Sequence, residues 1–280
     1  LKAIFSEIMS VDTAFASASL PVSVNTQGTY LNQVFIGMFR PELEPRWYGN
    51  LKQYQFRADV NADGEVVGLK LADKNNSPAI NVTNGFITPC ANSFWSTADT
   101  YWPNGYLGSC VSSDKRSNAP DGEVVEKGGA GQQLRALAIA SRSVKTCEGA
   151  CGSLADFATG NAAITKTLLG DAAMTNTARD DLIKWIRGEN LDNELSKGTT
   201  VMRPSVHGDV VHSRPLAVDY GGTTGVVVYY GGNDGMLRAI NGKKEDAAGS
   251  ELWSFVAPEH YGKLKRLKAN SPNIKFPDAP

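Results

Sequence analysis

The chain has 280 residues, of which 41% are hydrophobic and 20% are charged, and its formal net charge is −1. This balance is typical of a globular protein with one large core or two modest ones. It gives no electrostatic reason to bind nucleic acid or an anionic membrane. No run of about 18 apolar residues is present, so no transmembrane segment is predicted.

The first part of the chain combines one predicted helix with several predicted strands. Apolar residues at helical spacing predict a helix within residues 1–12. The stretches "ASASLPVSV" and "QVFIGMF" are typical of strands, and "RWYGNLKQYQF" with "EVVGLKLA" predicts a hairpin whose turn is "ADVNADG". Residues 13–200 are therefore predicted to form a β-rich, loop-heavy lead-in region.

The turn of that hairpin also matches the start of an EF-hand-type calcium loop. Asp59, Asn61 and Asp63 stand at positions 1, 3 and 5 of such a loop, and Glu65 can offer its backbone carbonyl. The bidentate acid expected at position 12 is missing, since a lysine stands there. Two interpretations remain open: a hairpin turn rich in Asn, Asp and Gly, or a calcium site that Asp73 would complete.

The four cysteines form two local pairs. Cys90 and Cys110 flank a loop rich in Trp and Tyr, and Cys147 and Cys151 close the short loop "CEGAC". Two local disulfides are the simplest interpretation, whereas a four-cysteine zinc site fits the spacing poorly. The disulfides predict an oxidising location, which is the periplasm or the cell exterior.

Four aromatic residues lie between the first two cysteines: Trp95, Tyr101, Trp102 and Tyr106. Exposed aromatic rings on a disulfide-stapled loop would form a contact surface for a partner. The alternative is that the rings pack onto the loop's own core.

One helix is predicted near residues 177–187, from the stretch "TARDDLIKWIRG". Thr177 is expected to cap its N-terminus, with Asp180 at the position of a capping box. Gly188 is expected to end the helix, because glycine tolerates the left-handed conformation that follows a last turn. The preceding stretch 134–145 is typical of either a short helix or a strand.

Residues 201–280 are predicted to hold the first blade or blades of a β-propeller. Runs of β-branched and aromatic residues alternate there with turns of Gly, Asn and Asp. Trp253 is expected in the core of this unit. A single blade would leave unpaired strand edges, so the chain is predicted to be a piece of a longer protein or to receive further blades from elsewhere. The predicted strands lie at 215–219, 226–230, 236–240 and 251–256.

Six short sequence blocks follow one another along the chain: "WYGNLKQY", "SFWS", "GGAGQQL", "LIKWIRGEN", "GDVVHSRP" and "YYGGNDGMLRAI". In this order, and over nearly the whole chain, they resemble the PilC/PilY family of type IV pilus tip-associated adhesins and biogenesis factors. The resemblance implies a seven-bladed, modified (PQQ-like) propeller that begins in this chain. It also implies that residues 1–12 look like the closing helix of an upstream von Willebrand A-like domain.

The resemblance implies a non-enzymatic protein with a role in pilus assembly and retraction and in adhesion. Its implied partners are minor pilins at the fibre tip and a host-cell or abiotic surface. Its implied location is the periplasm, outer membrane surface or pilus tip of a Gram-negative-type bacterium. Two alternatives remain, a quinoprotein-like propeller dehydrogenase and a structural segment of an extracellular filament.

Few other residues suggest chemistry. His207 and His212 are five residues apart, which places them on opposite faces of an extended segment, so they are not expected to share a metal. No GxSxG elbow, HExxH helix or P-loop is present in the sequence. The expected fold class is mainly β with a few short helices, and calcium is the one cofactor that the sequence suggests.

Overall fold

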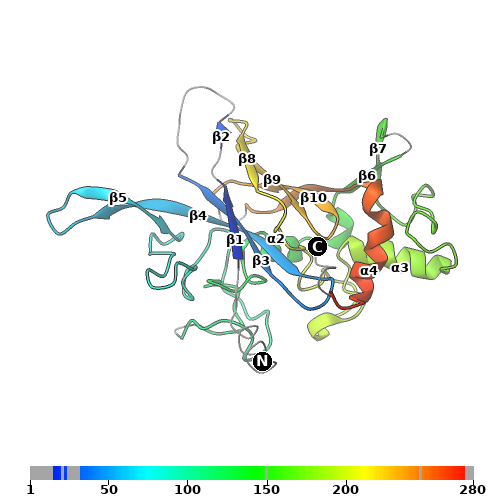
Figure 1. The fold of residues 1–280 in the computed structure, drawn as a ribbon, viewed down its shortest axis with the longest axis horizontal. Coiled ribbons are helices and arrows are strands. Elements are labelled where there is room, and N and C mark those ends of the chain that lie inside the picture. Colours follow the sequence, from blue (N-terminus) through cyan, green and yellow to red (C-terminus); the bar gives the residue numbers. More distant parts are fainter. Residues whose placement is uncertain are drawn as a thin grey trace.

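The protein is described by a computed structural model, and strands dominate it. The predicted class, mainly β with a few short helices, is confirmed: the strands form two sheets (Figure 1). The helix predicted within 1–12 lies outside the described residues. Those residues are 15–19, 22–23, 32–111, 113–148, 151–245 and 248–274, with the backbone alone described for the first two ranges.

The first sheet is antiparallel throughout. Its order is β1 (Phe15–Ser19), β3 (Val34–Arg40), β4 (Tyr48–Val60) and β5 (Val66–Ala72). The predicted hairpin is therefore confirmed as β4–β5, and its outer half projects from the body of the molecule (Figure 1). Both faces of β3 are buried. Successive side chains of a strand point to opposite faces, so Phe35 packs into one hydrophobic cluster and Ile36 into another.

The second sheet contains the four predicted blade strands as antiparallel neighbours, β8 to β11. It does not end there. A short strand, β2, pairs in parallel with β8, and a further hairpin, β6–β7, pairs in parallel with β11. The prediction of unpaired edges on this unit is therefore wrong, because distant parts of the same chain cover both. The order is β2 (Val22–Ser23), β8 (Leu216–Asp219), β9 (Val226–Gly232), β10 (Met236–Asn241), β11 (Glu251–Val256), β6 (Val144–Glu148) and β7 (Ser153–Asp156).

The two sheets meet in a shared hydrophobic cluster. Phe35 and Leu51 from the first sheet pack with Val228, Tyr230 and other side chains of the second. Trp95 completes this cluster and stacks on Phe35, with ring centroids 6.1 Å apart. The backbones also approach closely, because a Cβ at Gly49 would lie 1.9 Å from the carbonyl oxygen of Gly208. Only glycine fits there.

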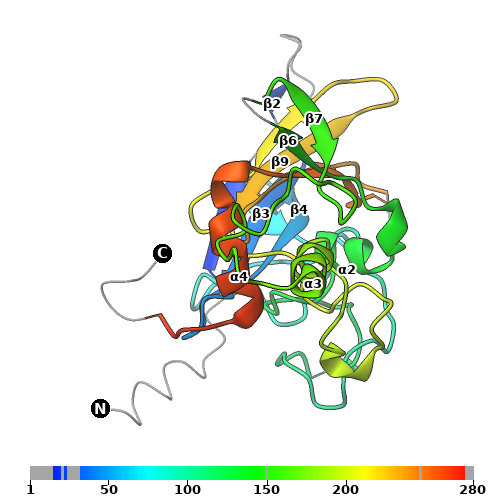
Figure 2. The ribbon, with the colours of Figure 1, turned by 90° about the vertical axis from the view of Figure 1, so that its right-hand side faces the viewer.

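Two helices cover one end of the second sheet, α3 (Asn176–Ile186) and α4 (Tyr261–Ala269) (Figure 2). The apolar face of α3 is buried in a cluster with Tyr261 and Leu264 of α4. The helix begins two residues earlier than predicted, because Thr175 is the N-cap and its Oγ1 accepts a hydrogen bond from the Ala178 N–H at 3.1 Å. Gly188 follows its end with a φ of 99°, as predicted.

The ambiguous stretch before α3 contains both kinds of structure. The short helix α2 (Gly129–Arg135) ends inside it, and β6 begins near its end. Trp253 differs from the prediction. It is half-buried on the outward face of β11, tilted against Tyr229 at 6.0 Å, and is not a core residue.

Candidate functional site

The disulfide-stapled segment was the main candidate surface, and its bridge is present. Cys90 and Cys110 are bonded with an S–S distance of 2.07 Å, and Cys147 and Cys151 with 2.02 Å. Both predicted pairings are therefore confirmed, and no free cysteine remains. Two disulfides indicate an oxidising, exported environment.

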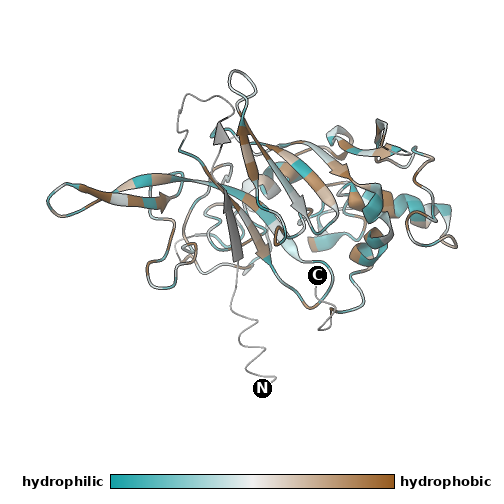
Figure 3. Ribbon diagram, turned by 45° about the horizontal axis from the view of Figure 1, so that its top comes forward, coloured by the Kyte–Doolittle hydropathy of each residue, from teal (hydrophilic) through white to brown (hydrophobic). Residues whose placement is uncertain are grey.

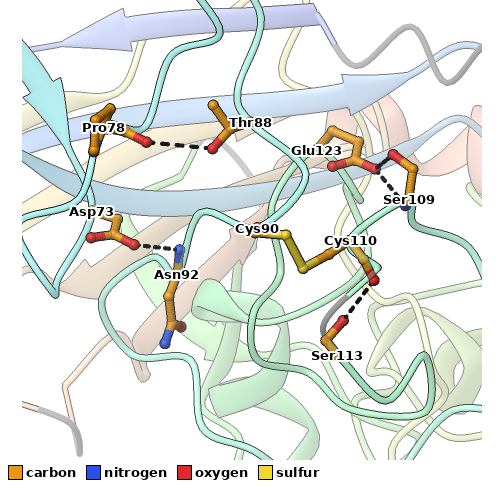
Figure 4. The surroundings of a disulfide bond; sticks show 9 residues. All are labelled: Asp73, Pro78, Thr88, Cys90, Asn92, Ser109, Cys110, Ser113 and Glu123. Atoms are coloured by element: carbon orange, nitrogen blue, oxygen red, sulfur yellow. Dashed lines mark hydrogen bonds between the residues drawn. A yellow bond between two sulfur atoms is a disulfide. The ribbon is translucent and has the colours of Figure 1, made fainter.

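Polar contacts hold the backbone on either side of the first bridge (Figure 4). The Ser109 N–H and Oγ–H both donate to Glu123 Oε1, at 2.9 and 2.8 Å. The Ser113 hydroxyl donates to the Cys110 carbonyl at 3.3 Å. The segment thus has defined positions without regular secondary structure, because its backbone groups are satisfied by side chains.

Asp73 organises the loops that lead to this bridge. Its Oδ1 accepts from the backbone N–H groups of Asn75 and Ser77, both at 2.9 Å, and its Oδ2 accepts from that of Asn92 at 3.0 Å (Figure 4). The side chain is buried. Asp73 is therefore a structural carboxylate, and both of its oxygens are already engaged.

The β4–β5 turn has the hydrogen bonds of a hairpin turn, which was the first of the two interpretations of this stretch. Asn61 Oδ1 accepts from the N–H groups of Asp63 and Glu65, at 3.0 and 2.9 Å, which makes an Asx turn. Asp59 pairs with Lys70 at 2.8 Å. Asp73 follows Ala72 at the base of the hairpin, several residues from the turn. A strand advances about 3.3 Å per residue, so Asp73 is too far away to complete a site at the turn.

No group of three or more His, Cys, Asp or Glu side chains that could hold a metal occurs among the described residues. Calcium binding at the β4–β5 turn stays a prediction. Titration with calcium in a calorimeter would measure it, and replacing Asp63 by Asn would abolish any heat that arises from this turn.

The interpretation of the aromatic residues as an exposed surface is wrong for the two tryptophans. Trp95 and Trp102 are 0% and 2% exposed. Trp95 Nε1 donates to the Lys243 carbonyl at 2.6 Å, and Trp102 Nε1 donates to Asn118 Oδ1 at 2.8 Å. The disulfide-stapled rings therefore pack inward, because large apolar rings gain more from burial when their N–H groups find acceptors.

The two tyrosines of this group lie half-buried beside Trp102. Tyr106 stacks on it with centroids 4.3 Å apart, and Tyr101 meets it edge-on at 5.1 Å. The guanidinium of Arg135 lies over the rings of both Tyr101 and Trp102, at 4.9 and 5.0 Å. Burial, with the nearby Glu126 carboxylate, raises the pKa of Tyr106, so its hydroxyl stays protonated and can donate.

A buried ion pair that the sequence does not predict lies beside this segment. Lys52 and Asp121 form an ion pair at 3.0 Å with both side chains fully buried. The ammonium also donates to three backbone carbonyls, and Asp121 accepts from the Ser93 hydroxyl at 2.7 Å. The only sign in the sequence is that this lysine lies within the predicted strand "WYGNLKQY". A lysine that is buried there needs a partner for its charge.

The blocks "GDVVHSRP" and "GGNDGMLRAI" come together at one junction, which is the best-defined polar site of the chain. The Gly208 N–H donates to Asp234 Oδ2 at 2.9 Å, and the Asn233 side chain donates to Asp209 Oδ1 at 2.8 Å. The Asn233 N–H donates to the Asp209 carbonyl at 3.0 Å. The spacing of the two blocks in the sequence gave no sign of these contacts.

Asp209 and the histidines at the junction have different environments. Burial raises the pKa of Asp209 to about 6, although the Val211 N–H opposes this. His207 is buried with Nδ1 at 3.0 Å from the Tyr230 hydroxyl, and burial and neighbouring arginines hold its pKa well below its ordinary value. It therefore stays neutral. His212 is exposed and lies near Asn233.

A line of buried charges connects the junction to the core. Arg238 pairs with Asp234 and lies 3.5 Å from Glu251, which in turn receives two hydrogen bonds from Arg142 at 2.8 and 2.9 Å. Burial disfavours the ionised form of Glu251, yet the guanidinium groups of Arg142 and Arg238 hold its pKa below the ordinary value. We call Asp234, Arg238, Glu251 and Arg142 the ionic ladder.

Comparison with protein-family models, with curated proteins and with solved structures found no match to this chain. Within the described part of the chain, no helix has both the length and the apolar content needed to cross a bilayer.

Proposed function

We propose that the chain is part of a non-enzymatic adhesion protein at the tip of a type IV pilus. The observation that carries the proposal is the junction. Two of the six blocks that carry the resemblance to the PilC/PilY family, "GDVVHSRP" and "YYGGNDGMLRAI", hydrogen-bond to each other through Gly208, Asp209, Asn233 and Asp234. Blocks that form one site in space support the resemblance better than blocks that merely share an order.

The proposed mechanical role is to hold shape while the fibre retracts. Three features support it: two disulfides, a shared core between the sheets, and the ionic ladder. Disulfides limit how far their segments can extend, and a buried ion pair resists separation because a single buried charge is costly. Minor pilins and a host-cell or abiotic surface are the proposed partners, and the cell surface or pilus tip is the proposed location.

A test needs a bacterium that makes the whole protein. We expect deletion of the coding region for residues 32–274 to lower both the number of surface pili and adherence to a surface. Electron microscopy would count the pili, and a wash assay would count attached cells. Unchanged piliation and adherence would overturn the proposal.

Variants at the junction make the test specific to it. Replacing Asp234 by Ala removes the partner of Gly208 and Arg238, and we expect it to reproduce part of the deletion phenotype. Replacing the half-buried Asp219 by Ala serves as the control, because among the described residues its carboxylate accepts a hydrogen bond only from the nearby Gly221 N–H. Addition of pyrroloquinoline quinone and calcium to the purified chain tests the dehydrogenase alternative, which requires a change in the absorbance of the quinone.

A further inference from the structure

The chain contains three Asn–Gly dipeptides, at residues 84–85, 104–105 and 241–242. In such a pair the backbone nitrogen of the glycine can attack the side-chain amide of the asparagine, because glycine has no side chain that shields its nitrogen. The attack also requires that the fold leaves the nitrogen and the amide free to approach each other. The structure gives the three dipeptides three different environments.

Asn241–Gly242 is held within the protein. It ends β10, in the second sheet, whose strands carry long apolar stretches in Figure 3. The Gly242 N–H donates to the Val226 carbonyl at 2.8 Å, and the Gly242 carbonyl accepts from the side chains of Gln33 and Gln53, at 2.8 and 3.3 Å. Gly242 is buried, and a Cβ there would lie 2.8 Å from Val226 Cγ1. Attack at this dipeptide requires the sheet to open locally.

Asn84–Gly85 is exposed, but both of its reacting groups are engaged. The Gly85 N–H donates to the Asn81 carbonyl at 2.8 Å. The side-chain oxygen of Asn84 accepts from the Phe86 N–H at 3.0 Å. The Asn81 N–H in turn donates to the Phe86 carbonyl at 2.8 Å, which closes the loop around the dipeptide. These hydrogen bonds must break before the glycine nitrogen can turn toward the amide.

Asn104–Gly105 is also exposed, and its reacting groups are free. It lies in a turn in which the Tyr106 N–H donates to the Pro103 carbonyl at 3.2 Å. Among the described residues, neither the Gly105 N–H nor the Asn104 side chain takes part in a hydrogen bond. A Cβ at Gly105, as at Gly85, would meet no atom within 4 Å. The nitrogen of Gly105 can therefore approach the amide without losing a hydrogen bond or displacing a neighbour.

We propose that Asn104 is a site of spontaneous deamidation, and that the fold protects the other two asparagines. The Gly105 nitrogen gives its proton to hydroxide and forms a bond to Asn104 Cγ. The bond from Cγ to Nδ2 breaks, and this nitrogen takes a proton from water and leaves as ammonia. A second water then opens the cyclic imide at either carbonyl, which leaves aspartate or isoaspartate. The product has one more negative charge within the loop that the Cys90–Cys110 disulfide closes.

The hydrogen bonds set the expected order of the three rates. Loss of one or two net hydrogen bonds corresponds to a rate difference of about fivefold to tenfold, so Asn84 should react slower than Asn104 by about that factor. Asn241 requires an opening of the core, so its rate should be lower by at least about a hundredfold. The proposal rests on these three environments and not on the proposed function.

Incubation of the purified, folded chain in mildly alkaline buffer tests the proposal. Samples would be digested at mildly acidic pH, where the reaction is slow, and mass spectrometry would follow the mass increase that replacement of NH2 by OH causes. Labelling with an isoaspartate methyltransferase would identify the isoaspartate product. We expect conversion at Asn104 first. No conversion at Asn104, or conversion at Asn84 or Asn241 that is as fast, would overturn the proposal.

Two controls separate the fold from the local sequence. The variant Asn104→Gln should lack the early product, because the longer side chain does not favour closure of the same ring. In the chain reduced and unfolded in guanidinium chloride, the three asparagines should react at similar rates, because the hydrogen bonds that protect Asn84 and Asn241 are lost. If the folded and unfolded chains show the same ratios of rates, the neighbouring residues and not the fold set the order, and the proposal is wrong.

Discussion

Glu251 lies between two guanidinium groups in the core, and it is the only carboxylate that contacts Arg142 among the described residues. Replacing Glu251 by Gln leaves the Arg142 charge buried without a counter-charge. We expect this change to lower the free energy of unfolding by about 3–5 kcal/mol. Urea denaturation would measure the loss, with the exposed Glu259→Gln as the control. A loss below about 1 kcal/mol would contradict the role assigned to the ionic ladder.

Asp209 gives the junction a pH dependence of known sign. Its pKa is about 6 in the folded chain, mainly through burial, and about 3.9 in an unfolded one. A raised pKa means that the protonated form stabilises the fold, and that this contribution is lost as pH rises through 6. Between pH 7 and pH 5 we therefore expect Asp209 to raise the free energy of unfolding by about 1 kcal/mol.

The variant Asp209→Asn isolates this effect. The amide does not titrate, and its oxygen can still accept the hydrogen bonds that Asp209 Oδ1 receives from Asn233 and Val211. Chemical denaturation of both proteins at pH 5 and pH 7 would give the difference. An equal pH dependence for the two proteins would show that Asp209 is not the group responsible.

At the scale of elements, the start of α3 offers a sharp comparison between two threonines. Thr175 accepts a hydrogen bond from the Ala178 N–H, whereas Thr177 lies inside the first turn. Replacing Thr175 by Ala should cost about 1 kcal/mol, and replacing Thr177 by Ala should change stability by less than about 0.5 kcal/mol. Thermal denaturation of the two variants side by side measures both stability losses. A larger loss for the Thr177 variant than for the Thr175 variant would mean that Thr177 is the N-cap, as the sequence pattern predicts.

The same helix shows how far local patterns reach. Its apolar face and its final glycine were predictable, because both depend on residues a few positions apart. Its N-cap was not predictable. Thr177 and Asp180 have the spacing of a capping box, but the residue that caps the helix is Thr175. The outward position of Trp253 was hidden in the same way. Its strand, "ELWSFV", has apolar residues at both parities, so alternation does not assign a face.

Long-range pairings and buried charges were the least predictable features. The four blade strands and both disulfides follow from local spacing, and they were found. The pairing of β2 with β8 and of β6 with β11 joins segments far apart in the chain, and no local pattern encodes it. The Lys52–Asp121 pair was missed for the same reason: its members are 69 residues apart.

At the scale of the whole molecule, the two disulfides should differ in what they contribute. Cys90 and Cys110 are 20 residues apart, and Cys147 and Cys151 are 4 apart. Chain entropy predicts a loss of about 3 kcal/mol when the first pair is replaced by alanines and about 2 kcal/mol for the second. Urea denaturation of the two double variants, with the parent chain as reference, measures both losses. A larger loss for the shorter loop would contradict the entropic account.

The covered edges of the second sheet also have a consequence for the order in which the chain acquires its structure. Val22 of β2 pairs with Val218, and Val144 of β6 pairs with Ser254. During synthesis, β2 and β6 therefore emerge long before β8 and β11, the strands with which they pair. They can pair only after the last quarter of the chain has been made. Contacts of such high sequence separation close slowly, so refolding should take milliseconds to seconds and should stall in any chain shortened before β11.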